Sequence, residues 1–265
     1  MSKSVKIIVI FTAALLIMLA AVQVYGDEVT KKFEAKKRVT VNTVSGDCIV
    51  EKSETNEITA TFIQHTRPDG AMKPKFTESS SVLELEEIIR GSSSGDSRWI
   101  VRVPEGTKIE FTTASGSFSV EDMTGDFKVN TASGNIDITN CSGVFDINTA
   151  SGDIDASGIT IEDDAVFGTA SGTVRVDLAE TPEYDIRVGS ASGKAILMYN
   201  GHEIKGNFEF SYRPGKGHIE CPYDFDDEEE YYNGDQVYIR KSFVRGSDVP
   251  FVHIGTASGR AVLKK

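Results

Sequence analysis

The sequence from Ser115 to Ala156 reads SGSFSVEDMTGDFKVNTASGNIDITNCSGVFDINTASGDIDA. It contains a nine-residue unit, repeated in register, that consists of a small hydroxyl residue, a glycine and two apolar residues spaced two positions apart. That spacing places both apolar side chains on one face of a β-strand. Thr-Ala precedes every second unit, so Thr-Ala-Ser-Gly recurs with an eighteen-residue period. The stretch therefore predicts an architecture and says little about chemistry.

Each unit is long enough for one short strand and one tight turn, and two units make one coil. A single coil cannot bury its apolar face, but stacked coils pair their backbones at ~4.8 Å and join their inward side chains into one core. We therefore predict an all-β fold, a β-solenoid or β-roll-like stack of two-strand coils. The expected inward core includes Phe118, Phe127, Ile136, Phe145 and Ile154.

The glycines of the repeat are expected to lie in turns, where glycine relieves the steric cost of a left-handed backbone. The repeated serines are interpreted as turn residues, because nucleophilic catalysis needs one serine that a base and an oxyanion hole single out. The predicted turn glycines are Gly46, Gly116, Gly125, Gly134, Gly143, Gly152, Gly172, Gly193 and Gly259.

The repeat also sets the predicted organisation of the chain. The coil lengthens from 18 to 20 and then 21 residues along the array, as the positions of successive Ser-Gly steps show. Alternating apolar segments precede the array and already contain Thr43-Val44-Ser45-Gly46, so this region is expected to be continuous with it. The predicted regions are an N-terminal segment (1–26), an N-terminal β region with the first repeat (27–110), the regular array (111–198), an insertion with an acidic loop (199–252) and a final repeat or cap (253–265).

The N-terminal segment is a candidate export signal. Lys3 and Lys6 precede an apolar run from Ile7 to Val24, which ends near small residues. This order is typical of a secretory signal, although a run of about 18 residues is also long enough to remain as a membrane anchor. Both alternatives place the rest of the chain outside the cytoplasm, either secreted or anchored to the membrane through this segment.

Charge excludes one class of partner. The formal net charge is −12. Without the N-terminal segment the chain has 26 basic and 40 acidic residues, because that segment contributes two lysines and no acidic residue. Such a domain repels nucleic-acid phosphates and anionic lipid headgroups. We expect no nucleic-acid partner, and contact with a membrane only through an uncleaved N-terminal segment.

The cysteines Cys48, Cys141 and Cys221 are few and far apart. An odd, sparse set disfavours a disulfide framework or a metal cluster, and it leaves open one disulfide with one free thiol. Cys141 is interpreted as a small residue in the turn before Ser142.

The Thr-Ala-Ser-Gly copies, the preceding Val101-Arg102-Val103-Pro104 and the secretory N-terminus together resemble the "putative adhesin" families of prokaryotic β-strand-repeat cell-envelope proteins. The resemblance covers most of the chain from about Phe33 to Leu263. It implies a β-repeat architecture and an envelope location, and it brings no catalytic residues. Some members of these families are associated with envelope stress responses.

Two outward carboxylates are weak metal candidates. Asp137 and Asp155 lie eighteen residues apart and are expected to be neighbours on adjacent coils. Paired carboxylates can bind calcium or serve a glycosidase. The favoured interpretation is a solvated acidic row that Arg175 partly balances, because the glycine pattern of calcium-binding nonapeptides is missing.

The acidic run from Asp224 to Glu230 is a second weak candidate for calcium. Its spacing does not match an EF-hand loop, so a solvated charge run is favoured. Calcium is the one cofactor that these patterns leave open. The candidate ligands in this run are Asp224, Asp226 and Asp227.

The function expected from these patterns is that of an exported, non-enzymatic β-repeat protein, an adhesin-like binding or structural module of the cell envelope. Its partner would be an envelope or surface component, either protein or glycan. One alternative is an extracytoplasmic sensor of envelope stress that acts through a membrane partner. A second, disfavoured alternative is a carbohydrate-active enzyme that uses a solenoid face.

Overall fold

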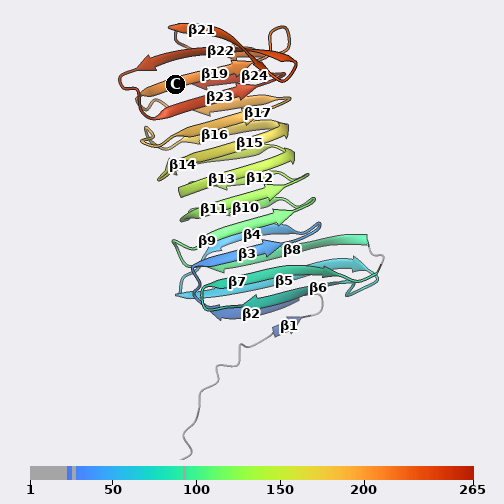
Figure 1. Cartoon of the computed structure of the whole chain (residues 1–265). Coiled ribbons are helices and arrows are strands. Elements are labelled where there is room, and N and C mark those ends of the chain that lie inside the picture. Colours follow the sequence, from blue (N-terminus) through green and yellow to red (C-terminus); the bar gives the residue numbers. More distant parts are fainter. Residues whose placement is uncertain (1–22, 26–27, 92–93) are drawn as a thin grey trace, which may run out of the picture.

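The computed structural model describes residues 23–25, 28–91 and 94–265, which form a rod of stacked β-strands (Figure 1). The predicted signal or anchor segment, residues 1–26, lies outside these ranges apart from 23–25. Within the described ranges, no helix has the length and hydropathy needed to cross a bilayer. Two sheets face each other along the rod, and each coil of the repeat supplies one strand to each sheet. The predicted all-β solenoid is confirmed.

One face of the rod, sheet 1, is parallel through its centre and antiparallel at its N-terminal end. At ~4.8 Å per strand the rod is about 50 Å long. Its strands, in spatial order, are β1 (Gln23–Tyr25), β2 (Glu28–Glu34), β5 (Glu57–Arg67), β8 (Ser94–Val103), β4 (Asp47–Lys52), β10 (Phe118–Glu121), β12 (Ile136–Thr139), β14 (Ile154–Ile161), β16 (Thr173–Leu178), β18 (Lys194–Met198), β24 (Arg260–Lys264) and β20 (His218–Glu220).

The opposite face, sheet 2, is parallel in its centre and antiparallel at both ends. Its strands, in spatial order, are β6 (Met72–Glu78), β7 (Val82–Ile89), β3 (Arg38–Asn42), β9 (Lys108–Thr113), β11 (Thr124–Thr131), β13 (Ser142–Ser151), β15 (Ala165–Ser171), β17 (Ile186–Ser190), β23 (Phe251–Thr256), β19 (Gly206–Tyr212), β22 (Gln236–Arg245) and β21 (Asp227–Asn233).

The core runs between the two sheets along the whole stack. The structure buries all five predicted inward residues to at most 1% exposure. In sheet 2, Phe127, Phe145 and Phe167 stack on one another, with ring centroids 5.6 and 5.7 Å apart. The strands pair in parallel and in register, so equivalent positions of successive repeats lie next to each other. Similar apolar side chains therefore stack from layer to layer and fill the core continuously.

The two ends of the rod are built alike. The first coil in the sequence, β3–β4, is not outermost, because β7 and β8 lie outside it, followed by antiparallel β6, β5 and β2. At the other end β23–β24 lies between β17–β18 and β19–β20. The predicted cap, the final repeat 253–265, is therefore internal. The excursion 199–252 forms the outer layers instead, with β22 and β21 beyond β19.

The free edges of sheet 2 carry residues that discourage further pairing. At the N-terminal end β6 contains Pro74, which has no backbone N–H, between Lys73 and Lys75. At the C-terminal end β21 begins with four acidic residues. Proline and charge on an edge strand both oppose edge-to-edge aggregation.

The glycines of the repeat are needed for a reason other than the one predicted. Among the nine predicted turn glycines, only Gly143, Gly172 and Gly259 have positive φ, and Gly125 and Gly143 lie inside strands rather than in turns. A Cβ added at Gly134 would instead overlap with the carbonyl oxygen of Gly116 in the neighbouring layer. The same overlap, with the preceding glycine of the series, would occur at Gly116, Gly152, Gly172, Gly193 and Gly259. Close backbone approach therefore selects glycine at these corners.

The threonine of Thr-Ala-Ser-Gly completes the corner. Its buried hydroxyl donates a hydrogen bond to the carbonyl oxygen of a corner glycine in the neighbouring layer. For Thr149 and Gly134 the distance is 3.1 Å. Equivalent bonds join Thr131 to Gly116, Thr169 to Gly152, Ser190 to Gly172 and Thr256 to Gly193. The hydroxyl satisfies an acceptor that would otherwise be buried without a partner.

At the N-terminal corner the carboxylate of Glu87 takes the place of the backbone carbonyl groups that accept hydrogen bonds at the other corners. Its buried carboxylate accepts the backbone N–H groups of Val44 at 2.7 Å and Ser45 at 3.2 Å, and also the hydroxyl of Ser97. In the next layer the N–H of Ser115 instead bonds to the carbonyl oxygen of Val44. One carboxylate thus satisfies two backbone N–H groups that have no carbonyl partner from another layer among the described residues.

A candidate ligand-binding site at the C-terminal cap

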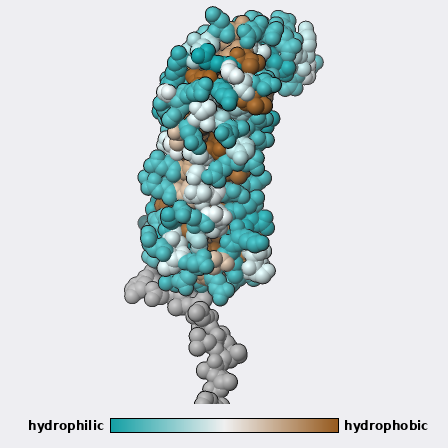
Figure 2. All heavy atoms as spheres, turned by 90° about the vertical axis from the view of Figure 1, so that its left-hand side faces the viewer, coloured by the Kyte–Doolittle hydropathy of each residue, from teal (hydrophilic) through white to brown (hydrophobic). Residues whose placement is uncertain are grey.

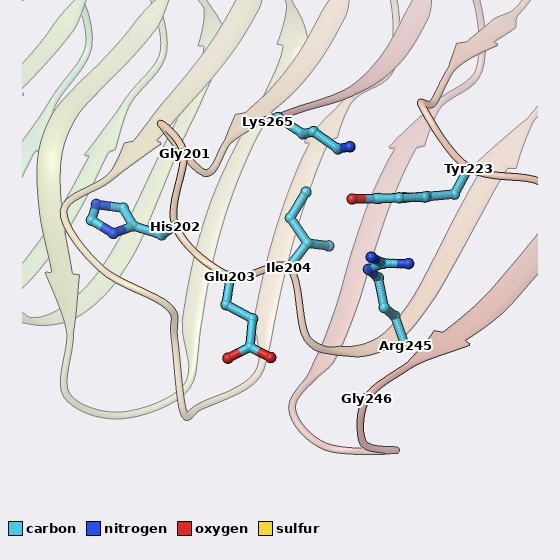
Figure 3. A pocket seen from close by; sticks show the side chains of 8 residues that line it. All are labelled: Gly201, His202, Glu203, Ile204, Tyr223, Arg245, Gly246 and Lys265. Carbon is cyan, nitrogen blue, oxygen red and sulfur yellow. The ribbon is translucent and has the colours of Figure 1, made fainter.

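The C-terminal cap contains a pocket of about 440 Å³ (Figure 3). The strands next to it, β19, β22 and β24, lie at the end of the rod opposite β1 and β2 (Figure 1). Four segments form the pocket: the loop between β18 and β19, the segment after β20, the end of β22 and the residue after β24. The lining residues are Gly201, His202, Glu203, Ile204, Tyr223, Arg245, Gly246 and Lys265.

Tyr223 lines one side of this pocket and lies between two cations. The guanidinium carbon of Arg245 lies 4.3 Å from the ring centroid, and Nζ of Lys265 lies 5.1 Å from it. Figure 3 shows the phenol hydroxyl pointing into the pocket between these two groups, towards Ile204. The aromatic ring fixes both cations by cation–π attraction.

The neighbouring core holds the Tyr223 ring in place. Its centroid lies 5.5 Å from that of Phe243, a buried residue of β22 two positions before Arg245. Because side chains alternate along a strand, Arg245 lies on the same face of β22 as the buried Phe243 and Ile239, and its place at the end of the strand brings its guanidinium over the Tyr223 ring. The fold therefore sets the position of both Tyr223 and Arg245.

The opposite wall is a braced loop. The Thr181 hydroxyl donates to the carbonyl oxygen of Glu203 at 2.8 Å, and the Asn200 side-chain amide donates to that of Leu178 at 3.1 Å. Ile204 is 5% exposed and supplies the apolar part of the wall. These bonds present a loop of fixed shape to the pocket.

The pocket concentrates positive charge on an acidic protein. Neither Arg245 nor Lys265 forms an ion pair within the described part of the chain, and the side-chain stem of Lys205 lies beside Gly246. Glu203 is the acidic residue of the lining. A guanidinium, an ammonium and a phenol hydroxyl are all hydrogen-bond donors, so the centre of the pocket is suited to accept an anion.

The predicted carboxylate pair is found on the outer face of sheet 1. Asp137 and Asp155 are direct neighbours in register on β12 and β14. Burial, and then the charge of Asp155, raise the pKa of the Asp137 carboxyl. Asp137 also borders a shallow groove of about 390 Å³ that includes Ser119 and Thr139. The structure therefore brings these carboxylates together as the sequence predicts.

Arg175 interacts with this pair only through the charge of Asp155, which helps to raise the pKa of Arg175 after the hydrogen bond and the charge of Asp177. It lies next to Asp155 in register on β16, but its guanidinium binds Asp177 with contacts of 2.8, 3.1 and 3.2 Å. Side chains two positions apart on a strand share a face, so the pair within β16 forms readily. Among the ion pairs of the described residues, none joins a cation directly to Asp137 or Asp155, so Arg175 offsets their repulsion only from a distance.

The acidic run is a strand and not the predicted loop. From Asp227 it forms β21, and Glu228 and Glu229 pair with Lys241 and Arg240 of β22 at 2.9 and 2.7 Å. Opposite charges on adjacent strands stabilise the pairing of β21 with β22. The carboxylates also discourage another chain from pairing with β21, which is the outermost strand of sheet 2.

The calcium candidates of this run are similarly placed. The carboxylate of Asp226 accepts the N–H of Val244 at 3.2 Å, Asp227 belongs to β21, and Asp224 is exposed. Across the residues that the structure describes, no three acidic, histidine or cysteine side chains converge as a metal site would require, and this includes the neighbourhood of Asp137 and Asp155.

A strip of glycines crosses the outer face of sheet 2 near the cap. Gly168, Gly189 and Gly255 are in register on β15, β17 and β23. Beside them Ser211 Oγ lies 2.9 Å from His253 Nε2. Glu209 faces the same nitrogen at 3.9 Å, whereas a catalytic triad needs the carboxylate on the other ring nitrogen. Burial, followed by the charges of Arg187 and Arg240, lowers the pKa of His253.

All three cysteines have free thiols. Cys48 and Cys141 are buried, and Cys141 donates to the carbonyl oxygen of Thr139 at 3.2 Å. Burial raises the pKa of all three thiols. A raised pKa keeps a thiol protonated and unreactive at neutral pH.

Sequence reasoning did not find the cap pocket. Tyr223, Arg245 and Lys265 come from segments about twenty residues apart and have no shared motif. The available signal was a series of cations in an insertion otherwise marked by acidic residues. These cations alone do not show which residues lie close together in space. The insertion lacks the eighteen-residue repeat from which neighbours can be inferred elsewhere in the chain.

Solved structures of three bacterial proteins are similar to the chain at low sequence identity. A "putative cell adhesion protein" of Clostridium sporogenes is 14% identical, with coverage of 91% of this chain and 99% of that chain and a TM-score of 0.31. A "putative adhesin" of Bacteroides fragilis is 9% identical, with coverage of 89% and 96% and a TM-score of 0.39. A "putative adhesin" of Parabacteroides merdae is 10% identical, with coverage of 91% and 97% and a TM-score of 0.32. These TM-scores are too low to support an argument.

No curated protein matches the chain. A family model does match it, over residues 28–211, which is more than half of the sequence and includes the described strands from β2 to most of β19. The repeat that predicts the fold and the layers that the structure shows both lie largely within that match. The chain belongs to the Toastrack DUF4097 family.

Proposed function

We propose that the protein is an exported, non-enzymatic binding module of the cell envelope, an adhesin-like rod that presents its C-terminal cap to a surface component. The N-terminal segment either is cleaved on export or holds the rod at the membrane. The partner is a protein or a glycan of the envelope or of a neighbouring surface.

One observation carries this proposal: the position of the cap pocket on the rod. The strands β1 and β2 lie at one end of the rod, and β19, β22 and β24, which border the pocket, lie at the other (Figure 1). A continuous core about 50 Å long separates them, at ~4.8 Å per strand. An anchor at the first end would therefore hold the pocket away from the membrane. Loops on a rigid scaffold are common places for binding residues.

The surface of the rod agrees with this role. On the face shown in Figure 2 the side of the rod is mainly hydrophilic, and hydrophobic atoms form small separate patches, several of them near the C-terminal end. In the cap, Val249 is 63% and Val244 is 53% exposed, and Val244 precedes Arg245. Exposed apolar side chains of this kind are available to the apolar part of a protein contact surface.

The alternative that a specific observation favours is a carbohydrate-active enzyme on sheet 1. Asp137 and Asp155 are paired, and the raised pKa of Asp137 is a property of catalytic acids. If this alternative holds, the protein will degrade cell-wall or surface glycans, and the activity will disappear in Asp137→Ala and in Asp155→Ala. Glycan degradation that depends on both residues would contradict the binding proposal.

Cosedimentation of the full-length protein with isolated cell envelopes tests the binding proposal. We expect saturable binding with no release of soluble glycan. N-terminal sequencing of the exported protein, together with fractionation, distinguishes a secreted from an anchored form. Recovery of the protein only in the cytoplasm, or the absence of any envelope binding, would contradict the proposal. Copurification with one membrane protein would favour the stress-sensor alternative instead.

A further inference from the structure

We propose that the cap pocket binds an anionic sugar unit, whose carboxylate or phosphate is held by Arg245, Lys265 and the hydroxyl of Tyr223. This inference deepens the proposed function and rests on it. The pocket has the cations, the central donor and the volume that such a unit requires, as the following observations show.

The first observation is that two like charges face one small space. Arg245 and Lys265 approach opposite sides of the Tyr223 ring, at 4.3 and 5.1 Å from its centroid (Figure 3). Each cation is held on its own face of the ring, so both charges remain at the border of the same pocket. No protein carboxylate pairs with either one among the described ion pairs. An external anion in the pocket would therefore be attracted by both charges without displacing a carboxylate of the described chain.

The second observation concerns hydrogen-bond donors. A guanidinium presents a planar fork that fits carboxylate and phosphate oxygens, and an ammonium adds a point charge. The Tyr223 hydroxyl points into the pocket between them and has no hydrogen-bond partner among the described side chains. Together these groups surround the place that an anion would occupy.

The third observation concerns the ligand's size and its uncharged part. The pocket volume of about 440 Å³ exceeds what an inorganic ion needs and lies in the range of small-molecule sites. Ile204 gives one apolar contact, and the exposed Glu203 and His202 carry polar groups at the other side of the pocket. A sugar has both an apolar C–H face and hydroxyl groups, so it matches this mixed lining better than an apolar ligand would.

Nearby acidic residues limit which ligands fit. Glu203 lines the pocket, Asp224 follows the lining residue Tyr223, and Asp248 lies two residues after the lining residue Gly246. These carboxylates would repel a polyanion that covered the whole cap. They permit a single anion at the end where Arg245 and Lys265 converge.

Titration calorimetry on the full-length protein tests the inference, with D-glucuronate and glucose 6-phosphate as charged probes and glucose and inorganic phosphate as controls. We expect at least one charged sugar to bind and glucose not to bind. Binding should weaken about tenfold or more in Arg245→Gln, since a charge-assisted contact is lost. Tyr223→Phe keeps the ring that orders the cations but should also weaken binding.

Lys216→Gln is the matched control. It removes the same charge from the cap, but it lies in the loop after β19, at the opposite end of that strand from the pocket, about 20 Å away for seven residues. This variant should bind the charged sugar as the native protein does. Equal losses in Lys216→Gln and Arg245→Gln would show a non-specific charge effect and overturn the inference.

The other outcomes are equally decisive. If neither charged sugar binds, or if glucose binds as well as they do, the inference is wrong. If inorganic phosphate binds as tightly as glucose 6-phosphate, the pocket holds an adventitious ion only. Envelope binding that persists in Arg245→Gln would overturn the pocket's role and the contact through the cap, whereas the absence of envelope binding by the native protein would overturn the envelope role itself, so the two failures are distinguishable.

Discussion

At the scale of single residues, the glycines of the repeat allow the backbones of neighbouring layers to approach closely at one corner of the rod. Thr149 and Gly134 illustrate it: the glycine lets the next layer come near, and the threonine hydroxyl satisfies the glycine carbonyl. The same pair recurs along one corner of the rod. The serine of the motif, which attracts attention as a nucleophile, is exposed at Ser133 and Ser151 and plays a smaller part in this arrangement.

A pair of glycine substitutions tests this role. Gly134→Ala should lower the free energy of unfolding by about 1–3 kcal/mol, because the new Cβ would overlap with the carbonyl oxygen of Gly116. Gly189→Ala is the control, since Gly189 has no positive φ and the nearest atom to its Cβ would be 3.9 Å away. Its effect should stay within about 1 kcal/mol. Urea unfolding measures both, and equal costs would contradict the close-approach explanation.

The carboxylate pair on sheet 1 predicts a dependence on pH. The pKa of Asp137 is raised by burial and by Asp155, so the folded protein binds this proton more readily than the unfolded chain does. Stability from this group is therefore present at acid pH and is lost as pH rises through the folded pKa. Asp137→Asn should raise the melting temperature at pH 7, and the difference should shrink as the pH falls below about 4.

The exposed loop residue Asp69 provides the control for this measurement. Asp69→Asn removes one negative charge from the same protein, far from β12 in the sequence. It should leave the melting temperature nearly unchanged at both pH values, since isolated surface charges contribute little. A lower melting temperature for Asp137→Asn at pH 7 would show that the carboxylate stabilises the fold, against the direction of its pKa shift.

At the scale of elements, the ends of the rod differ from its middle. The central strands pair in parallel and follow the repeat, whereas antiparallel hairpins cover both ends. The strand β21 shows why such an element is hard to recognise. Its sequence, DEEEYYN, has the composition of a solvated loop, but β22 neutralises two of its carboxylates and the others protect a free edge.

This arrangement makes a prediction about calcium. The Glu228 and Glu229 carboxylates are already paired with Lys241 and Arg240, and that of Asp226 accepts a backbone N–H. Millimolar calcium should therefore leave the melting temperature unchanged. Calorimetry with calcium and with magnesium provides the comparison, and a rise specific to calcium would show a structural site that the paired carboxylates do not suggest.

At the scale of the whole molecule, the predictable part is the part that repeats. An eighteen-residue period determines which side chains point inward, so the burial of Phe127 and Phe145 and the pairing of Asp137 with Asp155 follow from counting. The period also places Asp155 beside Arg175, but it cannot choose between Asp155 and Asp177 as the partner of that guanidinium. The hydrogen bonds within β16 determine that Arg175 pairs with Asp177.

The unpredictable part is the order of layers at the ends and the cap pocket. The final repeat is internal because its strands pair both with the regular array and with the excursion that precedes it. Such an order depends on long-range pairing, which local sequence does not encode. The residues of the pocket converge only because of this order, so no spacing in the sequence could reveal Tyr223, Arg245 and Lys265 as one group.

The central claim is that the rod is a binding module that works through its cap. Cosedimentation with isolated envelopes, comparing the native full-length protein with Arg245→Gln/Lys265→Gln and with Lys216→Gln, tests it most directly, with released glycan assayed in the same samples. We predict saturable binding by the native protein and by Lys216→Gln, a loss of about tenfold or more in the double variant, and no released glycan. Binding that is the same in all three proteins, or glycan release that requires Asp137, would contradict the account.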